Sequence, residues 1–426
     1  MDLYGEFEWR GLVYDATEGS REALRQGQVT GYVGFDPTAP SLHVGSLLVM
    51  TALAHMQRCG HAPIAVVGGG TGMIGDPSGK IAERQLLTVE KVEENVAGIR
   101  AQLARFLDFD STTAPARLVN NAEWLTKLTA IDFMRDVGKH FSVSAMLAKD
   151  SVKRRIESED GITYTEFSYS LLQAYDFLEL FDRFNCTLQM GGSDQWGNIT
   201  AGMDLIRRVR SAKTHGLVLP LITTASGTKF GKTEAGTIWL DPELTKPYVF
   251  YQFWLNTDDR DAVKYLRFFT FLTREAIDEL ERITVREPER RHAQRALAQE
   301  VTRLVHGEDA VREAETAAQK LFSGSIATMS VNELLQVFPN VPSTTTEYVD
   351  GGWPIVEFLS SSGVASSKSE AARLIRGGGI YINDERVTDE KFRLLPERAI
   401  EGQLFVVRKG KKDNYLVRLI RKIHGG

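Results

Sequence analysis

The sequence predicts an α/β fold: a parallel sheet with helices on its faces, then an α-helical domain, then a small α+β domain. Three observations support this prediction. Strand and helix patterns alternate over residues 1–245, helical periodicity dominates residues 246–325, and a compact unit at 352–426 follows a linker at 326–351. These ranges are also the predicted domain boundaries.

The first domain carries a signal for each of its elements. Residues 29–35 are expected to form a strand, and the amphipathic stretch 42–57 a helix. The apolar run 63–68 is typical of a strand buried on both faces, and 88–106 has helical periodicity. Further helices are expected at 168–180 and 197–210, with strands at 187–190 and 217–223. The alternation favours parallel strands joined by helices.

The rest of the chain changes character after Pro242. Residues 246–323 read as helices, for example 274–282 and 289–305, whereas 342–354 (PSTTTEYVDGGWP) reads as a polar linker. In the last unit, Ser367 and Glu370 have the spacing of a capping box for a helix at 369–376. A glycine turn at 377–379 and an alternating strand at 380–383 follow.

Composition restricts the class of protein. With 426 residues, 25% of them charged and 42% hydrophobic, the chain is expected to be globular and cytoplasmic. It has no apolar run of about 20 residues, and its acidic, aromatic start resembles neither a secretory signal nor a transit peptide. Cys59 and Cys186 lie far apart and form no zinc pattern, so no protein-bound metal is expected.

Charge is unevenly distributed. Residues 352–426 hold 14 Lys and Arg against 9 Asp and Glu, a net charge of +5, in a chain whose net charge is −5. The other residues therefore carry −10. A basic end on an acidic body indicates an anionic partner for that end, although a solvated basic surface is the alternative.

The first of three phosphate-type signals is the turn after the 29–35 strand. Ser41 is expected to cap the following helix, which would place His43 and Gly45 in its first turn. A helix N-terminus offers free N–H groups and a positive dipole to phosphate. Gly45 would let a flat base approach the backbone. Alone, this pattern equally fits a solvated histidine.

The second signal is a basic loop, in which Lys229 and Lys232 flank Phe230 and Gly231 and Thr233 follows. Such a loop is suited to closing over a triphosphate and stabilising charge in the transition state. A solvated basic turn is the alternative.

The third signal is the glycine-rich run after the 63–68 strand. Gly70, Gly72 and Gly75 match the dinucleotide fingerprint, but no second strand ending in an acid follows about 20 residues later. The P-loop pattern fails as well, because the Gly75–Gly79 spacing is one residue short and Ile81 replaces Ser or Thr. What remains is a loop that holds Asp76 beside the basic side chains of Lys80 and Arg84.

Taken together, the His43 and Lys229 signals resemble the paired HIGH and KMSKS signatures of class I aminoacyl-tRNA synthetases. Ser46 departs from the second histidine, and Phe230-Gly231 from Met-Ser, although KFGKT-type loops are typical of the bacterial tyrosine enzymes. The sequence resembles the bacterial-type tyrosyl-tRNA synthetases over essentially the whole chain. The blocks that carry this resemblance are YVGFDPT (32–38), GDPSGK (75–80), YSLLQAYDF (169–177) and GGSDQWGN (191–198).

The residues of the third block can also be read directly. Tyr169, Gln173 and Asp176 are spaced by four and then three, so they share one helix face. A buried Asp176 accepts a bond from a phenol O–H, and Tyr32 at a strand end supplies a second contact. As is familiar from this enzyme family, phenylalanine would leave such buried groups unpaired. A solvated Asp176 is the alternative reading.

The resemblance implies a Rossmann-like catalytic domain that uses ATP with accompanying Mg²⁺, with positioning and charge stabilisation rather than a protein nucleophile. It implies tyrosine binding by Tyr32, Asp76, Tyr169, Gln173, Asp176 and Gln195. It implies ATP binding by Asp36, His43, Gly45, Gly192, Asp194, Lys229 and Lys232. It implies catalytic roles on the phosphates for Thr38, His43, Lys80, Arg84, Lys229, Lys232 and Thr233.

The last unit resembles an S4-like RNA-binding domain, so tRNA(Tyr) is the expected anionic partner and the helical domain the expected anticodon reader. The resemblance also implies a symmetric homodimer, with residues 161–166 at its interface. The predicted phosphate contacts are Arg373, Arg376, Arg408, Lys409, Lys411 and Lys412.

Three alternatives stay open. A tryptophanyl-tRNA synthetase shares the fold, but Asp176 with Tyr32 favours a phenol over an indole, and that family lacks the S4-like unit. A synthetase-derived RNA-binding protein without catalysis conflicts with the intact Asp76, Asp176 and Gln195. An NAD enzyme is disfavoured by the incomplete fingerprint.

Overall fold

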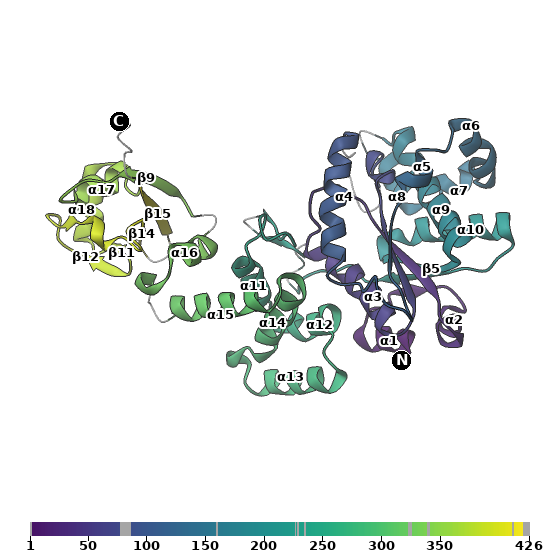
Figure 1. Ribbon diagram of the computed structural model, residues 1–426, viewed down its shortest axis with the longest axis horizontal. Coiled ribbons are helices and arrows are strands. Elements are labelled where there is room, and N and C mark those ends of the chain that lie inside the picture. Colours follow the sequence, from purple (N-terminus) through teal and green to yellow (C-terminus); the bar gives the residue numbers. More distant parts are fainter. Residues whose placement is uncertain are drawn as a thin grey trace. The chain divides into compact units, whose positions relative to one another are not determined.

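The computed structural model describes residues 2–76, 87–158, 161–225, 227, 230–233, 236–322, 326–338, 341–410 and 413–420. The chain forms two compact units (Figure 1). The first comprises Met1–Thr245 and Phe253–Val305, and the second Lys246–Gln252 and His306–Gly426. Within the described ranges, no helix combines the length and the apolar character needed to cross a membrane.

The first unit is built on a six-stranded sheet in the order β1-β6-β5-β2-β3-β4. All neighbours are parallel except β1, which pairs antiparallel with β6. The chain runs from β2 outward to β4 and then returns to place β5 on the other side of β2, so the order reverses between β2 and β5. The bounds are β1 Asp15–Ala16, β2 Thr30–Phe35, β3 Ala62–Val67, β4 Arg117–Asn120, β5 Cys186–Gly192 and β6 His215–Leu219.

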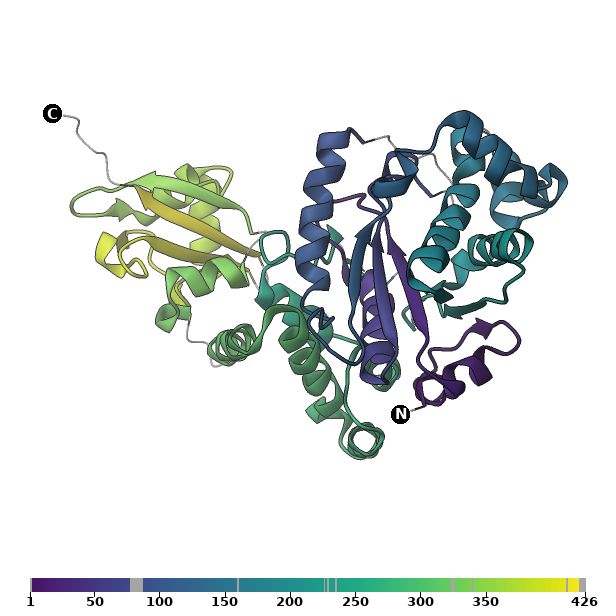
Figure 2. The ribbon, with the colours of Figure 1, turned by 45° about the vertical axis from the view of Figure 1, so that its right-hand side comes forward.

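Helices cover both faces of this sheet, as the prediction of a parallel α/β fold requires. Helix α4 lies on one face, and α9 and α10 lie together on the other (Figures 1 and 2). The core on the second side packs Tyr32 and Ile64 of the sheet against Phe177 and Leu205 of the helices. The helices are α1 Leu3–Arg10, α2 Ser20–Gln26, α3 Leu47–Arg58, α4 Val89–Leu103, α5 Ala122–Leu125, α6 Ala130–Asp132, α7 Val143–Leu147, α8 Asp150–Ile156, α9 Tyr164–Phe184 and α10 Trp196–Arg210.

Local chemistry explains where the elements depart from the expected bounds. Helix α9 begins four residues before the predicted 168, because Thr163 and Glu166 form a complete capping box. Strand β6 ends at Leu219, short of the predicted 223, because Pro220 follows and has no N–H to donate.

The helix expected over 42–57 begins later and is capped differently. A 3₁₀ turn, Val44–Ser46, precedes α3, and its N-cap is His43, not Ser41. The Ser41 hydroxyl donates to Leu42 O and accepts from Gln102 Nε2 at 2.8 Å and Asp241 N at 3.1 Å. Ser41 therefore fixes a junction of three segments instead of starting the helix.

Helices dominate after the sheet, as predicted. They are α11 Pro247–Leu255, α12 Asp259–Phe269, α13 Arg274–Arg286, α14 His292–His306 and α15 Glu308–Phe322. The helix expected over 289–305 is divided into a 3₁₀ turn, Pro288–Arg290, and α14, because Arg291 between them has a left-handed φ of 53°.

The second unit contains a five-stranded sheet in the order β12-β11-β14-β15-β9, and α17 and α18 contribute to its core with Phe358 and Ile375. At the start of α18, Ser367 Oγ accepts from Glu370 N, but the Glu370 carboxylate accepts from Ser366, so the capping box is shifted by one residue. The bounds are α16 Val331–Val337, β9 Ser343–Glu347, β10 Trp353–Pro354, α17 Ile355–Ser361, α18 Lys368–Arg376, β11 Ile380–Ile382, β12 Glu385–Val387, β13 Arg393–Leu394, β14 Leu404–Lys409 and β15 Asp413–Ile420.

The segment 342–354, expected as a polar linker, departs from that expectation. Its residues Ser343–Glu347 form β9, which pairs in parallel with β15 at the edge of the sheet. The three β-branched threonines at 344–346 favour a strand, and their polarity suits an edge exposed on one face. Polar composition indicated a linker, but β-branching decided the local structure.

Candidate active site

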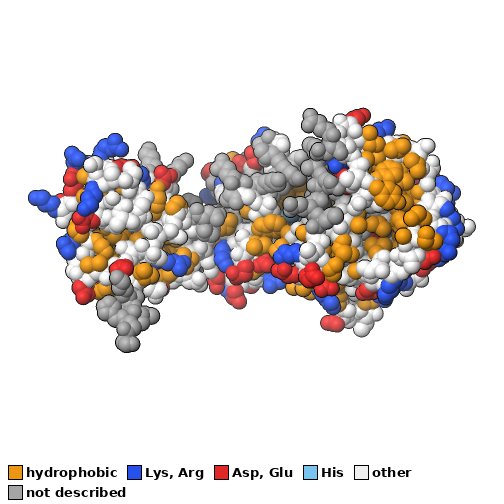
Figure 3. Space-filling view, turned by 90° about the horizontal axis from the view of Figure 1, so that it is seen from above, with side chains coloured by type: hydrophobic (Ala, Val, Ile, Leu, Met, Phe, Trp, Pro, Cys, Tyr) orange, Lys and Arg blue, Asp and Glu red, His pale blue; other side chains and the backbone are white. Residues whose placement is uncertain are grey.

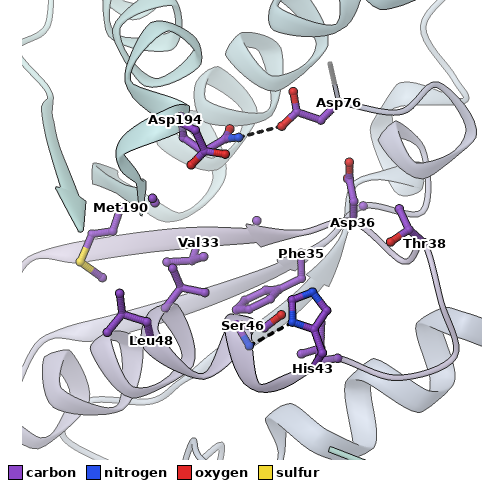
Figure 4. Close-up of a pocket in the computed structure, with 18 of the residues that line it drawn as sticks. Val33, Phe35, Asp36, Thr38, His43, Ser46, Leu48, Asp76, Met190 and Asp194 are labelled. Atoms are coloured by element: carbon purple, nitrogen blue, oxygen red, sulfur yellow. Dashed lines mark hydrogen bonds between the residues drawn. The ribbon is translucent and has the colours of Figure 1, made fainter. Parts of the chain in front are cut away.

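A cavity of about 720 Å³ lies in the first unit at the carboxyl ends of β2 and β5, where the strand order reverses. In open parallel sheets this position is the expected ligand site. Figure 4 shows an apolar side formed by Val33, Leu48 and Met190, and an opposite side with Asp36, Asp76 and Asp194. The cavity brings together twelve predicted site residues: Tyr32, Asp36, Thr38, His43, Gly45, Asp76, Tyr169, Gln173, Asp176, Gly192, Asp194 and Gln195.

Asp176 is a buried carboxylate that two donors hold in place. Its side chain is 4% exposed; Oδ2 accepts from Asn121 Nδ2 at 2.9 Å, and Oδ1 accepts from Trp124 Nε1 at 2.7 Å. Burial raises the pKa of Asp176 to about 7, while these two hydrogen bonds act in the opposite direction. Each oxygen keeps a lone pair for a ligand in the cavity.

Tyr32 lines the same cavity and has an unsatisfied hydroxyl. Its side chain is 1% exposed, and its O–H is buried with no hydrogen-bond partner in the described part of the chain. The ring packs edge-on against Phe177, with centroids 5.3 Å apart. Burial, and then the charge of Asp176, raise the pKa of Tyr32, so the hydroxyl stays protonated. Leaving it unpaired costs about 1–3 kcal/mol, which a polar ligand atom would offset.

Asp36, at the end of β2, is held from two sides. Tyr169 Oη donates to Oδ2 and Thr71 Oγ1 donates to Oδ1, each at 2.8 Å. Burial, and then the Asp36 carboxylate, raise the pKa of Tyr169. A Cβ on Gly68 would come within 2.3 Å of Asp36 Oδ1, so only glycine leaves room for the carboxylate at this point.

Amide side chains connect Asp76 to the helices. Gln195 Nε2 donates to Asp76 Oδ2 at 2.7 Å, the dashed line that ends on Asp76 in Figure 4. Gln173 Nε2 donates to Gln195 Oε1 at 3.2 Å. A 3₁₀ turn, Ser193–Gln195, positions Gln195, whereas Gln173 comes from α9. The cluster thus unites three residues that lie far apart in the sequence.

The His43 turn differs from its expected form. His43 Nδ1 accepts from Gly45 N at 3.0 Å (Figure 4), so Nε2 is the ring nitrogen that carries a proton when the imidazole is neutral. A Cβ at Gly45 would come within 2.7 Å of the His43 ring. Gly45 therefore accommodates the capping imidazole, rather than serving only the approach of a flat base.

Some predicted residues lie outside this description. Lys80, Arg84, Lys229, Lys411 and Lys412 are not among the described residues, nor are the side chains of Lys232 and Thr233. The backbone of Lys232–Thr233 forms β7, paired with β8, Gly236–Thr237. In the second unit, Arg373 and Arg376 lie on α18 and Arg408 and Lys409 on β14. Of these, Arg376 pairs with Glu390 and Lys409 with Glu370.

Sequence reasoning missed several residues that hold the site. Asn121 and Trp124 bind Asp176, and Thr71 binds both Asn121 and Asp36. The available signal was the Asn120-Asn121 pair after the apolar Leu118-Val119, since polar residues at the carboxyl end of a parallel strand often face the site. The described part of the glycine-rich run forms a turn, in which Gly68–Gly70 and a 3₁₀ helix, Thr71–Met73, follow β3.

The fold and the site together define a Rossmann-like α/β protein with a ligand cavity at its topological switch point. Residues 24–323 match the family model "tRNA synthetases class I (W and Y)", and residues 333–417 match "Tyrosine--tRNA ligase SYY-like C-terminal domain". The chain belongs to the class I tRNA synthetases, and within them to the tyrosine–tRNA ligase family.

Relatives of known name agree over almost the whole chain. A tyrosine–tRNA ligase from Roseiflexus castenholzii is 56% identical over 421 residues, which is 98% of this chain and 99% of the relative. One from Geobacillus stearothermophilus is 53% identical, with 98% and 100% covered. The solved structure of a truncated mitochondrial tyrosyl-tRNA synthetase from Aspergillus nidulans matches with a TM-score of 0.68 and 32% identity, over 75% of this chain and 94% of that one.

Proposed function

We propose that this chain activates L-tyrosine with ATP in the described cavity and then transfers the tyrosyl group to the 3′ end of tRNA(Tyr). The observation that carries the proposal is the unpaired, buried hydroxyl of Tyr32, which lines the same cavity as the carboxylate of Asp176. A substrate phenol satisfies both groups at once: its O–H donates to Asp176 and its oxygen accepts from Tyr32.

Selectivity against phenylalanine follows from these two groups. A phenyl ring fills the same volume but leaves the Tyr32 hydroxyl and one Asp176 lone pair without partners. Each unmet buried group costs about 1–3 kcal/mol, and more for a charged one. Against tryptophan, the indole N–H donates to Asp176 but has no acceptor for the Tyr32 hydroxyl.

The opposite end of the amino acid meets the carboxylate and amide cluster. In this proposal Asp76, Tyr169 and Gln173 bind the α-ammonium, and Gln195 lies near the substrate carboxylate. A cationic ammonium favours the oxygens of Asp76 and Gln173, because charge-assisted hydrogen bonds are roughly twice as strong as neutral ones. The substrate is thereby held with its carboxylate free to react.

The nucleotide would occupy the rest of the cavity. Asp194 and Gly192 meet the ribose, Asp36 lies near substrate and nucleotide, and Gly45 lies at the base side. The tyrosine carboxylate attacks the α-phosphorus, the bond to the β-phosphate breaks, and pyrophosphate leaves with its Mg²⁺. Positioning and charge stabilisation supply the catalysis, so no side chain acts as a nucleophile. The γ-phosphate and pyrophosphate are bound by Thr38, His43, Lys80, Arg84, Lys229, Lys232 and Thr233.

In the second step the terminal ribose hydroxyl of the tRNA attacks the activated carbonyl and AMP leaves. We assign phosphate contacts to the S4-like unit at 352–426 and anticodon reading to the helical segment 246–325, with 326–351 between them. Such phosphate contacts position the tRNA without reading its sequence. The contacts proposed for the unit are Arg373, Arg376, Arg408, Lys409, Lys411 and Lys412.

We also propose that the enzyme acts as a cytoplasmic homodimer. The catalytic unit carries exposed hydrophobic side chains on consecutive segments after β4, and Figure 3 displays such an apolar area. Clustered apolar exposure of this kind is typical of a protein interface. The residues concerned are Ile131, Met134, Val143, Leu147, Ile156 and Tyr164, the last of which belongs to the predicted 161–166 segment.

ATP–pyrophosphate exchange with a panel of amino acids tests the proposal. Strong exchange is expected with tyrosine and almost none with phenylalanine or tryptophan. Exchange driven by tryptophan would overturn the tyrosine assignment, and the absence of exchange with every amino acid would favour an RNA-binding protein without catalysis.

A further inference from the structure

Asn198 connects the amide cluster although it does not line the cavity. It lies on α10, its side chain is 6% exposed, and its Nδ2 donates to both Gln173 Oε1 at 3.1 Å and Gln195 Oε1 at 3.2 Å. One buried amide nitrogen thus holds the oxygens of two residues that do line the cavity.

The donor and the acceptor of each hydrogen bond in this cluster can be assigned by starting from Asp76. The carboxylate of Asp76, when ionised, only accepts, so Gln195 must turn Nε2 toward it and Oε1 away. Gln195 Oε1 then needs donors, which are Gln173 Nε2 and Asn198 Nδ2. This leaves Gln173 Oε1, which accepts the second bond from Asn198 and keeps one lone pair.

We propose that Asn198 is a positioning residue that, together with Gln195, holds the sense of the Gln173 amide, and thereby presents oxygen rather than nitrogen of Gln173 to the α-ammonium of the amino acid. The inference rests on the proposed function, because it deepens the role given to Gln173. Without a donor at position 198, the Gln173 amide could rotate by 180°. The rotated amide would present its NH₂ group, a donor, to the α-ammonium of the substrate, which is also a donor.

The variant N198D replaces the NH₂ donor at position 198 by a carboxylate oxygen, which is an acceptor, at almost unchanged side-chain size. Its carboxylate would face two amide oxygens and favour the rotated form of Gln173, in which Nε2 donates to position 198. N198A removes the donor without favouring rotation, and N198S keeps one hydroxyl donor. The effects are therefore expected to fall in the order N198D, N198A, N198S. R207Q, at an exposed site on the same helix, makes the same change in net charge and serves as the control.

The readout is the inhibition of tyrosine-dependent ATP–pyrophosphate exchange by two fragments of the substrate. Tyramine carries the ammonium without the carboxylate, and 3-(4-hydroxyphenyl)propanoate carries the carboxylate without the ammonium. For N198D we expect tyramine to bind about tenfold more weakly or worse, since a charge-assisted bond is lost, with KM for tyrosine raised more than kcat is lowered. Binding of the propanoate should change by less than about threefold.

Equal weakening of both fragments would indicate a general packing role and overturn the inference, as would N198D binding tyramine like the wild type. If N198D proves unstable to heat, the comparison of N198A with N198S decides, because loss of the donor alone still removes one of the two hydrogen bonds that orient the Gln173 amide. A wild-type enzyme that does not exchange with tyrosine would refute the proposed function instead, which keeps the two failures distinct.

Discussion

Replacing Tyr32 by phenylalanine should stabilise the ligand-free protein while weakening tyrosine binding. The hydroxyl that Tyr32→Phe removes is buried without a partner in the described structure, so its loss relieves a desolvation cost that no hydrogen bond offsets. Given about 1–3 kcal/mol for an unpaired buried polar group, the free energy of unfolding should rise by about 1 kcal/mol or stay unchanged.

Binding should change in the opposite direction. A neutral hydrogen bond between the Tyr32 hydroxyl and the substrate oxygen contributes about 0.5–1.5 kcal/mol, so KM for tyrosine should rise roughly 2- to 12-fold. The preference for tyrosine over phenylalanine should fall by a similar factor, because only tyrosine loses a bond. Urea unfolding of the ligand-free enzyme and ATP–pyrophosphate exchange measure the two quantities.

Tyr175→Phe is the matched control, on the same helix as Asp176. Its hydroxyl donates to Glu179 Oε1 at 2.6 Å and the residue does not line the cavity. The control should lose about 1 kcal/mol or more of stability and keep its KM for tyrosine. A Tyr32→Phe protein that is clearly less stable than the wild type, or that binds tyrosine equally well, would refute the reasoning.

Three further predictions concern other parts of the molecule. Trp124→Phe removes a donor to Asp176 Oδ1, so the pKa of that carboxyl should rise above about 7. The acid limb of the pH profile of kcat/KM for tyrosine should then move to higher pH, and an unchanged profile would contradict this reasoning. Burial lowers the pKa of His55 to about 3, so below about pH 6.5 the unfolded chain binds a proton at this histidine that the folded chain does not bind. The free energy of unfolding should therefore decline as the pH falls from about 6.5 toward about 3. His55→Leu should flatten this part of a pH series of urea unfolding curves. Deleting 352–426 should spare adenylate formation and abolish tRNA charging, and a truncated enzyme that charges normally would remove the tail from tRNA binding.

The parallel sheet and the helices beside it followed from local patterns. The apolar run that became β3 is buried at every position, and periodic helices on both sides leave a parallel arrangement as the simplest packing. Bounds were less predictable, because they depend on single contacts. Thr163 with Glu166 extends α9, and Pro220 shortens β6.

The cavity combines residues that motifs predicted with residues that motifs could not predict. Tyr32, Asp76 and Asp176 belong to blocks that the sequence displays openly, and the structure brings them to one cavity. Trp124 carries no distinctive local pattern, and the Asn120-Asn121 pair indicates a strand end but not its partner; the contacts to Asp176 exist only because β4 ends beside α9. Residues that become neighbours only through folding have no regular spacing in the sequence by which they could be recognised.

The sequence by itself determined the fold class, the order of the elements and the chemical types gathered in the site, because periodicity and motif spacing are properties of the chain. Only the tertiary structure decided which groups are paired. Tyr32 lacks a hydrogen-bond partner within the described residues, while Asp176 has two, and the amides of Gln173 and Gln195 are oriented by Asp76 and Asn198. Hydrogen bonding depends on distances of about 3 Å between atoms from different elements, and only packing sets those distances.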